Sequence, residues 1–234
     1  ESKNMPLVLW DSLILAGQEI HKPYADFLIL SPEEESLKIN FENFEKECSN
    51  ISSSHQKQKA ALAKTLKELS LMPKKDVNLK SKQEVINLSS IAFKVTCDAY
   101  SALMLGDSYP STIVKTLKAK GFDVENNKLC VDYMKIAHHG SANNTSNALL
   151  DLIDCDTFVI STNGGYGVSC HPDRETIGNI TWHPNRDHSK PVNFVFDYPL
   201  DDIETIGFKF LNKGEEEQND SFFVVHPDID YLPI

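Results

Sequence analysis

The stretch that decides the fold is VDYMKIAHHGS, residues Val131 to Ser141. Its first part is mostly apolar and predicts a buried strand over 131–137. Two histidines, a glycine and a serine follow directly, where this strand ends. Because α/β folds assemble their sites at the carboxyl ends of strands, the stretch predicts an α/β domain with functional groups at one edge of its sheet.

The residues upstream of this stretch continue the pattern. Strands are predicted over 89–98 and 102–105, and the second strand ends abruptly at Gly106-Asp107. A helix follows and is stopped by Gly121, since glycine is the residue that most often ends a helix. Asp107 is therefore placed, like the two histidines, directly after a strand.

The residues downstream also alternate between helix and strand. The sequence predicts a helix over 146–153 that Ser146 caps, a buried strand over 156–161, and a helix from His171 to about residue 179. Three further strands are predicted near the end of the chain and favour an antiparallel closing sheet or appendage. These are VNFVFDY (192–198), ETIGFKF (204–210) and SFFVVHP (221–227).

The composition is that of an ordinary globular protein. The chain has 234 residues, of which 41% are hydrophobic and 24% are charged, so disordered and fibrous classes are excluded. No window approaches the roughly 20 apolar residues that a membrane-spanning helix needs. The five cysteines are far apart and form no Cys-x-x-Cys pair, which favours reduced thiols and a cytoplasmic protein.

Four segments are predicted along the chain. Residues 1–32 contain strands, including MPLVLW and ADFLILSP, and Ser31-Pro32 ends the latter. Residues 33–83 form a helical insertion or linker in which Leu62, Leu66 and Leu69 share one apolar stripe. The main α/β unit spans 84–182, and a β-rich extension spans 183–234.

The insertion is basic although the whole chain is acidic. The net charge is −11, but residues 55–82 contain eight lysines against two acidic residues, a local net charge of +6. A solvated helix face explains such a run, and the alternative is a patch that binds phosphate through residues such as Lys64 and Lys67. The acidic total therefore does not exclude a nucleic-acid substrate.

Metal-type ligands follow three separate strands or loops. Asp107 has a carboxylate that could bridge two cations, and His138, His139 and His171 have imidazoles that could complete nitrogen coordination. Each histidine alone is more often packed or solvated than metal-bound. Cys170, beside His171, is interpreted as a packed thiol, and a second site at His183 and His188 is the weaker alternative because these two flank a loop.

In this order, the motifs resemble the second half of the metallo-β-lactamase fold. The resemblance is greatest to the nuclease-like domain of the bacterial competence DNA-uptake channel and its free-standing relatives. It rests on an Asn-x-Ser-Ser strand start at 87–90, the Gly106-Asp107 turn, the Lys-x-x-His-His-Gly-Ser string at 135–141 and His171-Pro172. It covers about residues 84–180 and implies half of an αββα sandwich.

The resemblance implies a dinuclear site with two divalent ions, Zn²⁺ or Mn²⁺. Asp107 would bridge the metals, and His139 and His171 would be ligands. Asp107, His138 and His139 would form the catalytic group, although the sequence does not decide which of the two adjacent histidines meets the metal and which acts as proton donor. Gly140 and Ser141 would bind a substrate oxyanion. The implied reaction is hydrolysis of a phosphodiester by a metal-generated hydroxide.

The family's first half, with its His-x-His-x-Asp-His loop, has no counterpart here. His21 and His55 stand alone. Because the chain begins without Met and its strands start where that first half would end, we expect the missing ligands on a separate N-terminal chain. Cleavage of one longer chain by an activating protease is the hypothesis that matches this expectation. A role in defence against foreign or viral nucleic acid is suggested by analogy alone. This chain alone should be inactive.

Two other functions stay open. The fold could act on a small phosphoester or another ester, because a narrow pocket would exclude polymers. Alternatively, it could be a catalytically degenerate subunit that binds or regulates a partner. No membrane association is expected in any of the three.

Overall fold

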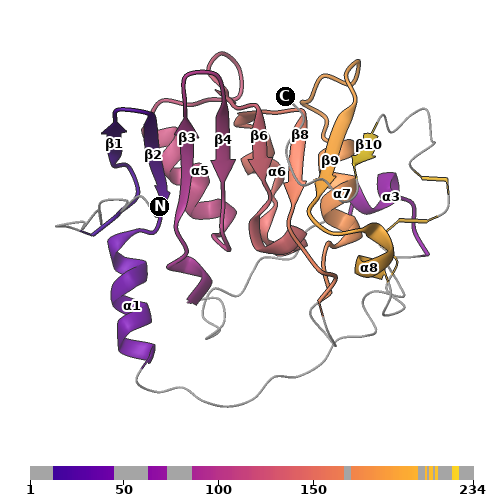
Figure 1. Cartoon of the computed structure of the whole chain (residues 1–234), viewed down its shortest axis with the longest axis horizontal. Coiled ribbons are helices and arrows are strands. Elements are labelled where there is room, and N and C mark those ends of the chain that lie inside the picture. Colours follow the sequence, from indigo (N-terminus) through magenta and orange to yellow (C-terminus); the bar gives the residue numbers. More distant parts are fainter. Residues whose placement is uncertain are drawn as a thin grey trace, which may run out of the picture.

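A computed structural model describes residues 13–44, 63–72, 86–165 and 170–204, with shorter pieces at 209, 211–212, 214–215 and 223–226. Its centre is an eight-stranded mixed sheet of order β1-β2-β3-β4-β6-β8-β9-β10 (Figure 1). The strands are β1 (Glu19–Lys22), β2 (Ala25–Ser31), β3 (Ala92–Thr96), β4 (Ser101–Met104), β6 (Tyr133–Lys135), β8 (Thr157–Ile160), β9 (Val192–Phe196) and β10 (Phe223–His226).

The sheet has an antiparallel part and a parallel part. Strands β1 to β4 pair antiparallel, while β4, β6, β8, β9 and β10 pair parallel in that order. Parallel neighbours need crossover connections, and helices provide most of them. A separate two-stranded parallel sheet joins β5 (Leu129–Cys130) to β7 (Ile153–Asp154).

Three helices build the core on one face of the sheet. They are α5 (Pro110–Ala119), α6 (Asn147–Leu150) and α7 (Arg174–Thr181), behind the strands in Figure 1. Their apolar side chains join one buried cluster with alternate strand residues such as Leu103, Met134 and Phe158. This period of two is what a strand with one buried face requires, so the core fixes which strand residues face the helices.

The predicted order of strands and helices in the central α/β region is confirmed, but two helix bounds are not: the helix predicted over 146–153 ends at Leu150 before β7, and the helix predicted from His171 begins at Arg174. Ser146 caps α6, with its Oγ accepting from the amide of Leu149 at 3.2 Å. Gly121 follows α5 with a φ of +87°, a conformation that glycine adopts without strain. Leu66 and Leu69 are buried in α3 (Leu66–Ser70), as the apolar stripe predicts, whereas Leu62 lies outside the described residues.

The prediction of an antiparallel closing sheet is wrong for the end of the chain. β9 pairs parallel with β8, and β10 pairs parallel with β9, so both extend the main sheet. The misleading signal was the short strand pattern, which is the same in parallel and antiparallel strands. The predicted strand MPLVLW and most of 204–210 lie outside the described residues.

The opposite face of the sheet carries a second apolar row. Phe93, Met104, Lys135 and Val159 lie side by side on neighbouring strands, and the row beside it contains Phe27, whose ring lies 5.8 Å from that of Phe93. These side chains are partly exposed, and they lie outside the cluster that packs against α5, α6 and α7. The sheet therefore has two apolar faces, and those three helices cover one.

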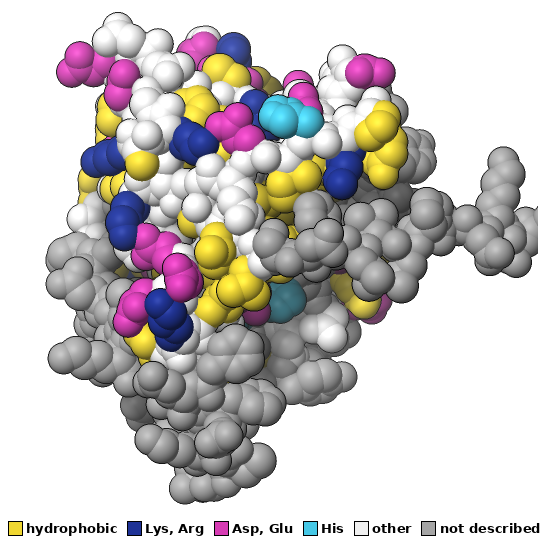
Figure 2. All heavy atoms as spheres, turned by 90° about the vertical axis from the view of Figure 1, so that its left-hand side faces the viewer, with side chains coloured by type: hydrophobic (Ala, Val, Ile, Leu, Met, Phe, Trp, Pro, Cys, Tyr) yellow, Lys and Arg dark blue, Asp and Glu magenta, His cyan; other side chains and the backbone are white. Residues whose placement is uncertain are grey.

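The β1 edge of the molecule is polar by contrast. Figure 2 faces the left side of Figure 1 and shows acidic and basic side chains interspersed. Lys120 pairs with Glu19 of β1 at 2.6 Å, and His21 contacts Asp26 at 2.7 Å. Charges on an edge strand oppose further strand pairing, so this edge is protected against extension of the sheet.

Two further helices are α1 (Glu34–Phe44), of 11 residues, in the insertion and the shorter α8 (Leu200–Glu204) after β9. Of the helices the structure describes, none has the length and apolarity needed to span a membrane. Four cysteines are described, and none of the four forms a disulfide. Cys170 is buried in the core, as predicted, and Cys48 lies outside the described residues.

Candidate functional site

The candidate site lies where four successive parallel strands end. Asp107 follows β4, His138 and His139 follow β6, Ser161 follows β8 and Asp197 follows β9. Because these strands are parallel neighbours, their carboxyl ends share one edge, the lower edge of the sheet in Figure 1. This topology brings the Asp107 and His138-His139 motifs to one edge, as predicted, whereas the ring contact with His138 places the third motif, at His171.

The histidines cluster tightly. The ring centroids of His138 and His171 are 5.5 Å apart, and those of His138 and His139 are 6.1 Å apart. The Asp107 turn is tied to them, since the amide of His138 donates to the carbonyl of Gly106 at 2.9 Å. On its other side, the amide of Asp107 donates to Ser90 Oγ at 2.9 Å, which links the turn to the Asn-x-Ser-Ser segment.

The backbone of the two adjacent histidines is left-handed. His138 has φ 48° and ψ 53°, and His139 has φ 56° and ψ 20°, within a short 3₁₀ segment, η1 (Ala137–Gly140). Non-glycine residues pay about 1–2 kcal/mol each for this region. Such strain persists where the surroundings over-determine it and is concentrated at functional sites.

Gly140 locks this strained turn onto the start of α7. Its φ is +89°, and a Cβ built there would lie 2.7 Å from the Cβ of Pro172. Its carbonyl accepts from the amide of Asp173 at 3.0 Å and from Thr176 Oγ1 at 2.7 Å. The Asp173 carboxylate accepts from the amide of Ala142 at 2.8 Å. The histidine turn and the His171-Pro172-Asp173 segment are therefore one interlocked unit.

His139 has a defined tautomer. Its Nδ1 lies 2.7 Å from the carbonyl oxygen of Ser161, which can only accept a hydrogen bond. Nδ1 therefore carries the proton, and the lone pair is on Nε2. A ring nitrogen hydrogen bond to a backbone carbonyl is the arrangement that orients histidine ligands in metal sites.

His171 is mostly buried, and its surroundings favour the neutral ring. Its side chain is 17% exposed, and burial is the main cause that lowers its pKa to about 4; His138 and His139 lower it further, while Asp107 opposes them. Its Nδ1 has no hydrogen-bond partner, and the nearest carboxylate oxygen, Oδ2 of Asp173, is 3.6 Å away. A buried imidazole nitrogen without a partner fits a cation ligand, because metals bind the neutral ring.

His138 differs from its neighbour because amide side chains contact it. Asn87 Nδ2 lies 3.4 Å from its Nδ1, and Asn144 hydrogen-bonds the ring and favours its protonated form. Burial outweighs these contacts and lowers the pKa of His138. Asn144 is 1% exposed and also donates to the carbonyls of Asp107 and Ser108, both at 3.1 Å. This geometry favours His139 as the ligand and His138 as the proton donor.

The predicted substrate-binding residues are placed differently from one another. Gly140 and Ser141 lie within the strained turn, but the amide of Ser141 donates to the carbonyl of His138 at 2.9 Å and is not directed at a substrate. Lys67 lies with its ammonium 4.5 Å from the Trp182 ring, at the far end of α7 from His171. Lys64 Nζ contacts Met72 Sδ at 3.2 Å. Lys67 is therefore not brought to the histidines, and the other lysines of the basic run lie outside the described residues.

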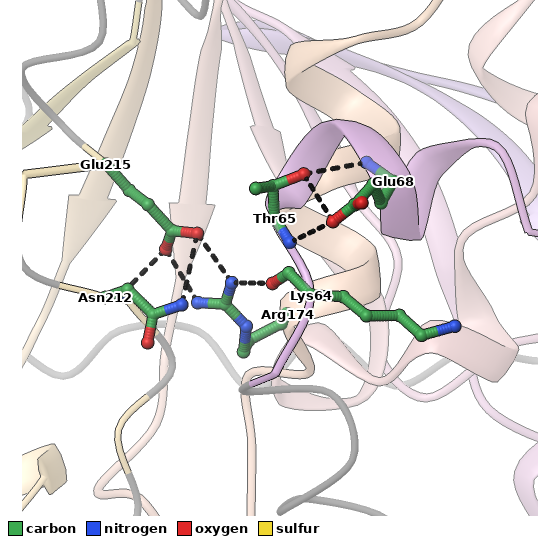
Figure 3. Close-up of polar contacts among 6 residues, drawn as sticks. All are labelled: Lys64, Thr65, Glu68, Arg174, Asn212 and Glu215. Atoms are coloured by element: carbon green, nitrogen blue, oxygen red, sulfur yellow. Dashed lines mark hydrogen bonds and ion pairs between the residues drawn. The ribbon is translucent and has the colours of Figure 1, made fainter.

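A buried ion pair attaches the insertion to the site. Arg174 donates to both carboxylate oxygens of Glu215, at 2.6 and 2.7 Å, and to the carbonyl of Lys64 at 2.8 Å (Figure 3). The Arg174 and Glu215 side chains are 1% and 4% exposed. Arg174 is the first residue of α7, so this pair joins the segment before α3 to the helix that begins next to His171.

Two residues of the site were not singled out from the sequence. Asp197 follows β9 in the same way that Asp107 follows β4. A carboxylate directly after a parallel strand was the signal for Asp107, and it would also have indicated Asp197 if β9 had been predicted to be parallel. Asn144 had no sequence signal, because its role depends on contacts with segments distant in the chain.

The set of candidate metal ligands in the described residues is partial. Within the described residues, no three His, Cys, Asp or Glu side chains form a group that could hold a metal ion. Asp107, His139 and His171 share an edge, and their roles as metal ligands stay a prediction. Comparison of the chain with family models, curated proteins and solved structures gave no match.

Proposed function

We propose that this chain is the C-terminal half of a metal-dependent phosphodiesterase that acts on DNA or RNA. Its sheet would be one layer of a metallo-β-lactamase sandwich. The observation that carries the proposal is the pair of available imidazole nitrogens, Nε2 of His139 and Nδ1 of His171, at the strand edge that also bears Asp107. Neutral imidazoles with one carboxylate suit Zn²⁺ or Mn²⁺.

When bound, two divalent ions would activate water and stabilise the charge that develops on the phosphate. The residues of this chain would do the rest. His139 and His171 would hold their rings in fixed orientations, and Asp107 would supply the carboxylate. His138, held by Asn87 and Asn144, would deliver a proton to the departing oxygen.

A second polypeptide segment would complete the site. Among the described helices, α5, α6 and α7 pack on the opposite face, so the apolar face that includes Phe93, Met104 and Val159 is where a second sheet would dock. Lys135 lies in the same row, and the pKa of its ammonium is lowered by burial while Asp107 and Asp197 oppose the shift. This face thus reaches the candidate site, so a segment docked there would place a His-x-His-x-Asp-His loop beside Asp107.

The test is reconstitution with a polypeptide that carries the missing loop. The complex should contain at least one Zn²⁺ or Mn²⁺ and cleave single-stranded DNA or RNA, and Asp107→Ala should lower cleavage by about 100-fold or more. Asp187→Ala removes an exposed carboxylate that accepts from Ser189 Oγ, in the loop that carries His183 and His188 and not His138, His139 or His171, and is the matched control. Cleavage of polymers but not of a small phosphodiester would restrict the proposal to polymers. Cleavage of the small phosphodiester but not of polymers would indicate a small-phosphoester hydrolase.

The competing function is a degenerate subunit that binds a partner without catalysis. The lack of a three-residue metal group among the described residues favours it. Fewer than one metal per complex, together with cleavage that Asp107→Ala leaves unchanged, would overturn the hydrolase and leave the binding subunit.

A further inference from the structure

We infer that Asp197 is a positioning residue that sets both candidate ligands, His139 and His171, through two consecutive residues at the end of β8. The role as ligands rests on the proposed function, whereas the positioning rests on hydrogen bonds alone. Asp197 directly follows β9, the strand next to β8 in the sheet.

The carboxylate of Asp197 fixes the end of β8 with both of its oxygens. Oδ2 accepts from Ser161 Oγ at 2.6 Å, and Oδ1 accepts from the amide of Thr162 at 3.0 Å. Hydrogen bonds to an ionised carboxylate are the stronger kind, and two of them on adjacent residues define the orientation of the intervening peptide. That peptide carries the carbonyl of Ser161.

The two fixed residues each hold one histidine. The Ser161 carbonyl accepts the Nδ1 proton of His139 at 2.7 Å, which leaves Nε2 unprotonated. Thr162 Oγ1 donates to the carbonyl of His171 at 3.1 Å and accepts from the amide of Gly164 at 3.1 Å. The Asp197 side chain therefore sets the orientation of the His139 ring in η1 and the position of the His171 backbone before α7.

The fold offers a matched control at the other edge of the sheet. Asp132 accepts from the amide of Ser101 at 2.7 Å and from Ser101 Oγ at 2.9 Å. It thus binds a serine hydroxyl and a backbone amide, as Asp197 does. Ser101 begins β4, whereas the candidate ligands lie beyond the carboxyl ends of the strands. Replacing Asp132 removes the same kind of contact without touching the path to His139.

The primary experiment measures the tautomer of His139 in the full chain, in a metal-free buffer at pH 8, by long-range nitrogen–proton NMR. The wild type should show the Nδ1-protonated form. Asp197→Ala should shift His139 towards the mixture of tautomers seen in a free imidazole, while Asp132→Ala should leave it unchanged. An unaltered Nδ1-protonated signal in Asp197→Ala would overturn the inference.

Two milder variants guard against unfolding. Asp197→Asn keeps one acceptor oxygen, and Ser161→Ala removes only the hydroxyl that donates to Asp197; each should give a shift smaller than that of Asp197→Ala. If Asp197→Ala unfolds, these two decide, and wild-type tautomer populations in both would refute the positioning role.

A second readout uses Co²⁺ or Zn²⁺ alone, titrated into the reconstituted complex. Asp197→Ala should weaken binding by about 10- to 100-fold, the usual effect of removing a group that orients a ligand, and Asp132→Ala should not. A wild-type complex that binds neither metal would contradict the proposed function, and the tautomer measurement would still decide the inference.

Discussion

The two edges of the parallel sheet use similar residues for different ends. At the amino edge, Asp132 holds Ser101, and Cys155 is so buried that its pKa rises to about 12, which keeps the thiol unreactive. At the carboxyl edge, Asp197 holds Ser161, and Ser161 in turn holds His139. The same carboxylate–serine contact is a local cap at one edge and part of a chain of contacts at the other.

The edges also differ in strain. Among the described residues, the only non-glycine residues with positive φ are His138 and His139, both at the carboxyl edge. The amino edge instead has an open pocket of about 490 Å³, lined by residues such as Tyr100, Asp154 and Lys190. In this molecule, a carboxylate that accepts from a serine next to a strand marks the candidate site only where that serine also hydrogen-bonds a candidate ligand.

The largest difference in stability between the two edges is expected from their ion pairs. Arg174→Ala leaves Glu215 buried without its partner and should lower the free energy of unfolding by about 3–5 kcal/mol. At the amino edge, Lys190 and Asp156 form an exposed pair at 3.6 Å, so Lys190→Ala should cost less than about 1 kcal/mol. Urea unfolding of both variants measures the difference, and equal costs would contradict it.

Next in size is the effect of adding one methyl group to a glycine. Gly140→Ala combines a positive φ with a Cβ 2.7 Å from Pro172, so it should cost about 3 kcal/mol. Gly121→Ala, just past the end of α5, has a similar φ and nothing within 4 Å, and should cost about 1 kcal/mol. Thermal melting compares the two. If Gly121→Ala proved the more destabilising, the locked turn at Gly140 would be refuted.

The smallest expected effect is a pH dependence caused by His171. Its folded pKa of about 4 lies below the ordinary value of 6.5, so the unfolded chain binds more protons between these values. This contribution is complete above pH 6.5 and is lost as the pH falls towards 4, amounting to about 2 kcal/mol between pH 7 and 5.

The measurement is the free energy of unfolding of wild type and His171→Gln across that range in a metal chelator. The variant should show a slope that is shallower by about this amount. Parallel curves for the two proteins would mean that His171 is not buried in its neutral form.

The strand ends were the part of the site that the sequence made predictable. Asp107 and His138 each follow an apolar strand, and this placement survives folding because parallel strands end together. Asp197 follows a segment of the same kind, but its position depended on the direction of β9, which the pattern of a short strand does not specify. His171 lies before α7, and its Pro-Asp helix start was the signal that placed it.

Contacts between segments that are distant in the chain could not be predicted from the sequence, for a different reason. The link from Arg174 to Glu215 and Lys64 spans 41 residues on one side and 110 on the other. No local preference encodes such a pair, since it depends on how the whole chain packs. The lysine run shows the same limit, because its charge was evident but the position of Lys67 over Trp182 was not.

The pairing of β2 with β3 also determines how the segment between them can change in length. Ser31 pairs with Ala92, so the whole insertion is a loop between two adjacent strands. Loop-closure entropy grows only with the logarithm of length, and halving such a loop changes the free energy by about 0.6 kcal/mol. Changes of length between these strands should therefore cost little outside α3, provided that the carbonyl of Lys64 keeps its contact with Arg174. Within α3 they would displace Leu66 and Leu69, which are buried.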